Sequence, residues 1–163
     1  MNTLVIYDSL YGNTEKVANA MAEALGKEAK AVKVGQVKAG GLKDYAYVLI
    51  GSPTQGGRPT KAMQSFLAGL TEDDVLGKRF AAFDTRAQAF IVKLFGWAAP
   101  KIEKALKSKR ANCTAQPQGF FVEGTKGPLA EGELKRAGTW AKAIIAGLPT
   151  NLMPGEFNVK TKE

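Results

Sequence analysis

Short apolar runs alternate with amphipathic stretches along most of the chain. Four of these runs are too short for helices and are rich in β-branched or aromatic residues, which predicts strands. They cover residues 3–7, 31–34, 45–50 and 79–83. Residues 112–122 supply a fifth strand, which we expect to be interrupted near Pro117, because proline cannot donate a ladder hydrogen bond.

Helical periodicity follows the first, third, fourth and fifth strands. The predicted helices cover residues 14–25, a segment that begins at a Thr60 cap, residues 96–109 and residues 133–146. Gly26 stands where a glycine commonly ends a helix. The inward face of the last helix is expected to consist of Leu134, Ala137, Ala141, Ile144 and Ile145.

This alternation predicts an α/β fold with a parallel sheet covered on both faces, because parallel neighbours need helical crossovers. In such sheets a ligand binds beyond the carboxyl ends of the strands. The loops after the first, third and fourth strands are therefore the candidates. We expect one domain over residues 1–148 and a loose tail over residues 149–163.

The composition excludes several classes of chemistry. The 163 residues include no histidine, which removes imidazole-based triads and His-ligated metals. Cys113 is the single cysteine, so an intrachain disulfide or a CxxC redox pair is impossible, and we interpret Cys113 as a buried small hydrophobe. Redox chemistry would require a bound organic cofactor.

The net charge of +8 is compatible with an acidic partner, an anionic ligand, nucleic acid or an anionic membrane surface, and of these we expect an acidic partner protein. Basic residues gather on and after the third predicted helix, and they form either a docking surface or a solvated face: Lys101, Lys104, Lys107, Lys109 and Arg110. No aromatic residues interleave with them, so we expect no nucleic-acid binding. Without a membrane span or a signal-like N-terminus, we expect a cytoplasmic protein with no membrane insertion, either a monomer or a weak homodimer.

The loop after the first strand has the chemistry of a phosphate cradle. It reads YDSLYGNTEK over residues 7–16 and offers hydroxyls from Ser9 and Thr14, with Gly12 permitting close backbone approach. Four or five charge-assisted hydrogen bonds of roughly 1.5–3 kcal/mol each would hold a phosphate monoester without a lysine. The alternative is an ordinary turn followed by a Ser/Thr-capped helix.

The segment YDSLYGNT resembles the phosphate-binding loop of flavodoxins, in which Ser or Thr and two further residues precede Gly-Asn-Thr. GSPTQGGRPT at residues 51–60, FDTR at 83–86 and GFFVEGTKGPL at 119–129 extend the resemblance over the chain. It implies a flavodoxin-like three-layer sandwich, a five-stranded parallel sheet of order 2-1-3-4-5, and FMN. The implied phosphate contacts are Ser9, Leu10, Tyr11, Gly12, Asn13 and Thr14.

The same resemblance assigns the flavin ring to the next two loops. The implied contacts are Pro53, Thr54, Gln55, Gly56, Gly57 and Arg58, then Asp84, Thr85, Arg86 and Phe90. The Gly56–Gly57 peptide would flip to hydrogen-bond flavin N5, as in family members. Without the family, the second loop is a long glycine- and proline-rich connection. The segment at 119–129 either shapes the edge of the flavin site or only turns the chain.

Two features depart from typical flavodoxins. The second loop lacks its aromatic residue, and a lost stacking contact is worth about 1 kcal/mol. Phe90 is the aromatic residue of the third loop, whereas Phe95 and Trp97 are expected to pack in the core. The chain is also basic, and cations at Arg58 and Arg86 would favour the anionic reduced flavin.

The sequence thus favours an FMN-dependent one-electron carrier. No residue stands out as a dedicated acid or base, which suits a carrier better than an enzyme. One alternative is an NAD(P)H- or quinol-linked FMN oxidoreductase on the same fold. The other is a flavodoxin-like scaffold that has lost FMN and binds another phosphorylated ligand or a protein.

Overall fold

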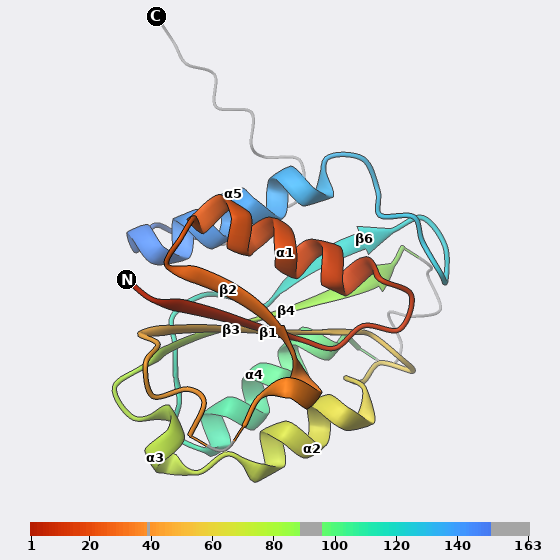
Figure 1. Ribbon diagram of the computed structural model, residues 1–163. Helices are drawn as coiled ribbons and strands as arrows, with labels where there is room; N and C mark the ends of the chain where they lie inside the picture. The colour runs from red at the N-terminus through yellow and green to blue at the C-terminus, as the bar shows by residue number, and fades with distance from the viewer. Residues whose placement is uncertain (39, 89–95, 151–163) are drawn as a thin grey trace, which may run out of the picture.

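The computed structural model describes residues 1–38, 40–88 and 96–150. A twisted sheet forms the middle of three layers, with α1 and α5 on one face and α2 and α4 on the other (Figure 1). The helices are α1 (Asn13–Leu25), α2 (Lys61–Gly69), α3 (Glu72–Val75), α4 (Ala98–Ser108) and α5 (Glu133–Ala146), with a 3₁₀ turn η1 at Val34–Gln36. The predicted three-layer α/β sandwich is confirmed.

Every strand pair of the described sheet is parallel, in the order β2-β1-β3-β4-β5. The strands are β1 (Thr3–Tyr7), β2 (Ala29–Lys33), β3 (Tyr47–Pro53), β4 (Arg79–Ala87), β5 (Asn112–Cys113) and β6 (Gln118–Val122). Both β5 and β6 pair with β4, so they share the fifth position and are separated by residues 114–117. The predicted order and the predicted interruption near Pro117 are confirmed.

Local capping chemistry defines two helices on the same face. The Thr60 hydroxyl accepts a hydrogen bond from the Met63 N–H at 3.2 Å, as the sequence predicted for the start of α2. The short helix α3 was not predicted. It begins at a capping box in which Thr71 and Asp74 satisfy each other's backbone N–H groups.

Each face of the sheet has its own hydrophobic core. Phe80 and Ile102 belong to the core under α2 and α4. Phe83, Phe120 and Trp140 belong to the core under α1 and α5, where their rings meet edge to face with centroids 6.0–6.3 Å apart. Because Phe80 and Phe83 come from one strand, β4 anchors both layers.

The predicted inward face of α5 is correct except at its first turn. Ala137, Ala141 and Ile144 are buried, but Leu134 is 43% exposed, so its predicted burial is wrong. Glu133 is buried instead, because its carboxylate accepts from the Phe121 N–H at 2.7 Å and thereby turns Leu134 outward.

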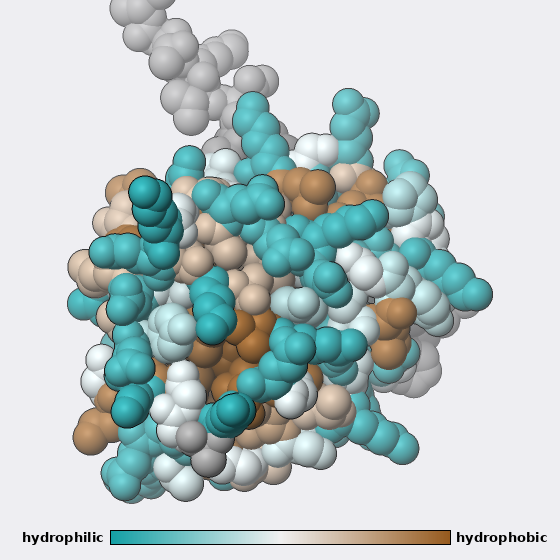
Figure 2. Space-filling view, in the orientation of Figure 1, coloured by the Kyte–Doolittle hydropathy of each residue, from teal (hydrophilic) through white to brown (hydrophobic). Residues whose placement is uncertain are grey.

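The surface is mainly hydrophilic. Figure 2 shows polar side chains over most of one face, around a hydrophobic area near its centre. The edge strand β2 carries Lys30 and Lys33, both exposed, and lysines on an edge strand oppose pairing with another sheet. Among the described residues, no helix combines the length and the hydropathy that crossing a membrane requires.

Candidate functional site

The carboxyl ends of β1, β3 and β4 meet at one edge of the sheet, because these strands are parallel and adjacent. Tyr7 at the end of β1 lies opposite Gly51, and Pro53 at the end of β3 lies opposite Thr85. The segments that follow therefore emerge side by side. The strand order reverses at β1, which is where open α/β sheets bind their ligands.

The first of these segments ends on Gly12, which precedes α1 with a φ of 87°. This left-handed conformation favours glycine. The Gly12 N–H donates to Ser9 Oγ at 3.1 Å, and the Ser9 hydroxyl retains its own proton to donate. No side chain caps the start of α1, so the alternative of a Ser/Thr-capped helix is wrong. The first-turn N–H groups of α1 remain available to a ligand.

The side chains at the start of α1 connect the first segment to two others. The Asn13 amide donates to the Lys126 carbonyl at 3.1 Å. The Thr14 and Thr85 hydroxyls share a buried hydrogen bond of 2.8 Å. Since both side chains contact protein, the backbone N–H groups, rather than the Asn13 and Thr14 side chains, are what this turn offers to an anion.

Asp8 links the first segment to the second. One of its oxygens accepts from the Ser9 N–H at 2.9 Å, and the other accepts from the Thr60 hydroxyl at 2.5 Å. The Thr60 N–H in turn donates to Ser52 Oγ at 3.0 Å. This buried network fixes the spacing between the two loops.

The second segment contains a tight turn at Gly56–Gly57. Gln55 and Arg58 exchange two backbone hydrogen bonds of 2.8 and 2.9 Å across it. Both glycines have positive φ, 53° and 78°, as a type I′ turn requires. Lys101 of α4 donates from its ammonium group to the Gly57 carbonyl at 2.5 Å. The turn is thus a defined structure and more than a long connection.

A buried ion pair follows at the end of β4. The Arg86 guanidinium donates two hydrogen bonds of 2.7 Å to the Asp84 carboxylate, which is fully buried. The Ala99 N–H, in the first turn of α4, adds a third at 2.8 Å. Burial raises the pKa of Asp84, and the Arg86 charge opposes that rise. A Cβ on Gly119 would lie 2.3 Å from the Arg86 guanidinium, so this glycine makes room for the pair.

A cavity of about 400 Å³ lies where these segments meet. Its described lining consists of Ser9, Leu10, Tyr11, Asn13, Thr14, Pro53, Thr54, Gln55, Gly56, Gly57, Thr85, Arg86, Ala87, Val122 and Thr125. Of the predicted site residues, Gly12 shapes the loop behind this wall, Asp84 is buried beneath it, and Arg58 lines a different groove. Phe90 lies outside the described residues. The cavity therefore unites most of the three predicted loops.

The sequence did not predict Ala87 as a site residue. It placed Val122 and Thr125 within the segment 119–129, for which shaping the edge of the site was one of two alternatives. Val122 ends β6 and Thr125 lies in the segment that follows, so the end of this strand and the next few residues form part of the cavity wall. Gly127 is the sequence signal that this segment lies close to the start of α1, because a Cβ on Gly127 would lie 2.8 Å from the Asn13 side-chain oxygen. Asp8 was also missed, although an acidic residue directly after a buried strand is itself a signal.

Two aromatic rings of this region contact cations. Tyr11 is 51% exposed, and the Lys126 ammonium lies 5.8 Å from its ring centre. Arg86 lies 4.2 Å above the Trp97 ring, so Trp97 packs against the ion pair. Phe95, like Phe90, lies outside the described residues. The second loop contributes no ring, as its sequence shows.

The family model described as "Flavodoxin" matches residues 5–140, which include every strand end described above. The chain belongs to the flavodoxin family. Solved flavodoxins share its fold. One from the domain Archaea superposes with a TM-score of 0.75 at 19% identity, covering 90% of this chain and 97% of that one. Oxidised flavodoxin 1 of Bacillus cereus gives 0.74 at 17% identity, covering 91% and 99%.

The flavodoxin fold also occurs as a part of larger proteins. Rubredoxin oxygen:oxidoreductase of Desulfovibrio gigas matches 90% of this flavodoxin-family chain over 36% of its own, with a TM-score of 0.67 and 19% identity. An uncharacterized protein of Methanocaldococcus jannaschii is 30% identical over 115 residues, 64% of this chain. The chain spans 27% of the length of that curated relative.

Proposed function

We propose that this flavodoxin-family chain is a cytoplasmic, FMN-dependent carrier that exchanges one electron at a time with an acidic partner protein. The observation that carries the proposal is the cavity at the carboxyl ends of β1, β3 and β4. Its wall contains the uncapped start of α1 on one side and a two-glycine turn on another. When bound, FMN would supply reversible electron transfer, and the chain would bind, orient and shield it.

The residues present fit the phosphate of FMN. Gly12 exposes backbone at the start of α1, and Ser9 keeps a hydroxyl proton to donate. No acidic residue occurs among the described lining residues, so no carboxylate opposes an anion there. Ser9, Leu10, Tyr11, Gly12, Asn13 and Thr14 would hold the phosphate group.

The second and third loops fit the flat ring system. The Gly56–Gly57 peptide can rotate between two turn types without a side-chain clash, because neither residue has a Cβ. Gln55, Gly56 and Gly57 would border one part of the ring, and Thr85 and Arg86 another. Without a second-loop aromatic residue, we expect FMN affinity about tenfold below that of a fully stacked site.

The sequence predicted that Arg58 and Arg86 would favour the anionic reduced flavin, but the structure places their charges differently. Arg86 is offset by Asp84, and Arg58 lines the groove outside the cavity. Lys101, bound to the Gly57 carbonyl, is the cation that the turn itself holds. We infer that Lys101 and Arg58, rather than Arg86, favour the anionic reduced flavin. A redox titration that gives potentials as low as those of acidic flavodoxins would contradict this.

The carrier is favoured over an enzyme by the cavity wall. Its described residues include no carboxylate and no thiol, and the Asp84 carboxylate beneath it is paired with Arg86. Among the described lining residues, Tyr11 is the one side chain of a type that commonly moves protons in catalysis, and it is 51% exposed. An enzyme that protonates its substrate at the cavity would have to use Tyr11 or solvent.

The test is an absorbance titration of the purified chain with FMN, followed by NAD(P)H. We expect saturation at one FMN per chain and no bleaching by NAD(P)H. Direct bleaching would support the oxidoreductase, and no binding in excess FMN would support a scaffold without FMN.

A further inference from the structure

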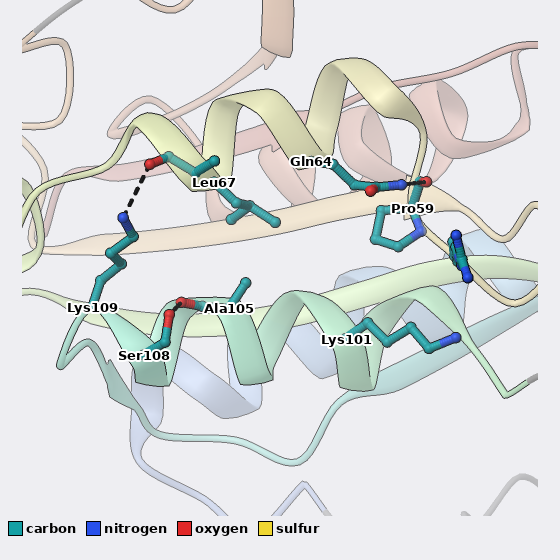
Figure 3. Close-up of a pocket in the computed structure, with 9 residues that line it drawn as sticks. Pro59, Gln64, Leu67, Lys101, Ala105, Ser108 and Lys109 are labelled. Carbon is teal, nitrogen blue, oxygen red and sulfur yellow. Dashed lines mark hydrogen bonds between the residues drawn. The ribbon is translucent and has the colours of Figure 1, made fainter.

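A second cavity of about 400 Å³ lies between α2 and α4 (Figure 3). We call it the α2–α4 groove and define it by Arg58, Pro59, Gln64, Leu67, Ala68, Lys101, Ala105, Ser108 and Lys109. Figure 3 shows Lys109 at one end and Lys101 toward the other, with Leu67 and Ala105 between them. The groove therefore has cationic ends and an apolar middle.

The charge of the groove has one sign. Its described lining contains Arg58, Lys101 and Lys109 and no acidic residue. Lys109 donates to the Ala68 carbonyl at 3.0 Å, and one of the contacts of Lys101 is with the Gly57 carbonyl. Neither of these two carbonyls cancels a positive charge. A carboxylate that enters the groove would therefore meet positive charges and, among the described lining residues, no negative charge.

The predicted basic cluster of α4 contains residues that line the groove and residues that lie outside it. Lys107 pairs with Glu103, and Arg110 pairs with Glu72 at 3.4 Å, both outside the groove. Lys101 and Lys109 line the groove, and Lys104 is exposed on α4 outside its lining. Lys104, Lys107 and Arg110 fit the alternative of a solvated face. Lys101 and Lys109 do not, because they line a cavity.

The groove adjoins the cavity that we assign to FMN. Gly57 lines that cavity, and the next residue, Arg58, lines the groove. Lys101 lines the groove and binds the Gly57 carbonyl at 2.5 Å. A molecule seated at this end of the groove would lie one turn of chain from the cofactor site, which is a suitable position for an electron-transfer partner.

We propose that the α2–α4 groove docks an extended acidic segment of the redox partner, and this rests on the proposed carrier function. Lys101 and Lys109 are eight residues apart on one helix, which is about 12 Å. An extended chain covers that distance in about four residues. The segment would therefore carry two carboxylates four positions apart with an apolar side chain between them over Leu67 and Ala105.

The test uses ¹⁵N–¹H spectra of the full chain titrated with the blocked peptide acetyl-Glu-Ala-Leu-Ala-Glu-amide. We expect saturable shifts confined to groove amides such as Gln64, Ala68 and Ser108. The Lys109→Met variant should weaken binding about 2- to 5-fold, the range of an exposed ion pair. Lys104→Met is the matched control, because it removes an exposed cation of α4 outside the groove, and it should change binding little.

Three results would overturn the proposal. One is the absence of groove shifts at 10 mM peptide, since even weak docking of this kind should be visible at about that concentration. The second is equal shifts from the peptide in which Gln replaces both Glu residues, because that result would show that charge does not determine binding. The third is equal shifts from glutarate, which would show a site for small anions.

FMN added to the same sample separates this proposal from the function on which it rests. FMN should shift the amides of residues 9–14 whether or not the peptide binds. FMN shifts without peptide shifts would overturn the docking site alone. Peptide shifts in a chain that does not respond to FMN would overturn its role in electron transfer.

Discussion

Asp8 and Thr60 are 52 positions apart in sequence, yet the Thr60 hydroxyl donates to the Asp8 carboxylate at 2.5 Å. Asp8 also accepts the Ser9 N–H in the loop after β1, and Thr60 caps α2. The contact therefore sets the distance between two walls of the cavity. Asp8 and Thr60 therefore position the walls of the cavity, although neither residue lines it.

Replacing Asp8 by alanine should destabilise the chain by about 2 kcal/mol, because a buried hydrogen bond to a charged group is lost and Thr60 keeps an unsatisfied hydroxyl. Urea unfolding measures this. Asp44→Ala, which removes an exposed carboxylate, is the matched control and should cost less than about 0.5 kcal/mol. Equal losses in both variants would contradict the role given to Asp8.

Substitutions at Gly56 can distinguish the cost of backbone strain from the cost of a steric clash. A Cβ there meets nothing within 4 Å, so the positive φ of 53° is the main obstacle to a side chain. Gly56→Ala should cost about 1–2 kcal/mol and weaken FMN binding, whereas Gly56→Asn should cost less, since asparagine adopts left-handed conformations more readily. Thermal unfolding and FMN titration provide the comparison. If alanine and asparagine behave alike, the turn is not held in this conformation.

Gly119 tests the space around the buried ion pair. Its substitution by alanine would place a Cβ 2.3 Å from the Arg86 guanidinium and should displace it from Asp84, at a cost of about 1–3 kcal/mol. Gly69 in α2 has open space and should instead tolerate alanine with no loss or a gain of up to about 1 kcal/mol. A Gly119→Ala variant as stable as Gly69→Ala would show that Arg86 can move freely.

Cys113 should react slowly with alkylating agents. Burial, chiefly, and the nearby Glu103 carboxylate raise the pKa of its thiol from 9.0 to about 11. At pH 8 the thiolate fraction, and with it the alkylation rate, should be about 100-fold below that of an unperturbed thiol. Because the pKa is higher in the folded chain, this thiol contributes stability at neutral pH that is lost as pH rises from 9 to 11. Iodoacetamide labelling against pH measures the rate, and rapid labelling at pH 8 would contradict the burial.

Regular elements were predictable where hydrophobic periodicity was strong. The bounds of β1 and α5 agree with the sequence prediction, because an apolar run and an amphipathic face define them locally. The short helix α3 depends on a capping box rather than on periodicity, and it was missed. Leu134 was misplaced because Glu133 binds the backbone of β6, a tertiary contact that helical spacing does not encode.

The site was predictable to the extent that it follows strand ends. The loops after β1 and β3 and the last residues of β4 meet in one cavity, as adjacent parallel strands predict. Sequence alone could not show that Arg86 pairs with Asp84 or that Arg58 leaves the cavity wall for the α2–α4 groove. Those outcomes depend on α4, whose first turn supplies a donor to Asp84 and whose Lys101 holds the Gly57 carbonyl.

The dissociation constants of FMN and riboflavin, which differ only by the phosphate, provide the sharpest test of the proposed FMN site. If the start of α1 holds that phosphate with two or more charge-assisted hydrogen bonds, FMN should bind at one per chain and roughly 100-fold more tightly than riboflavin. Equal affinities would contradict the phosphate contacts proposed at the start of α1, and no FMN binding would contradict the proposed FMN-dependent function.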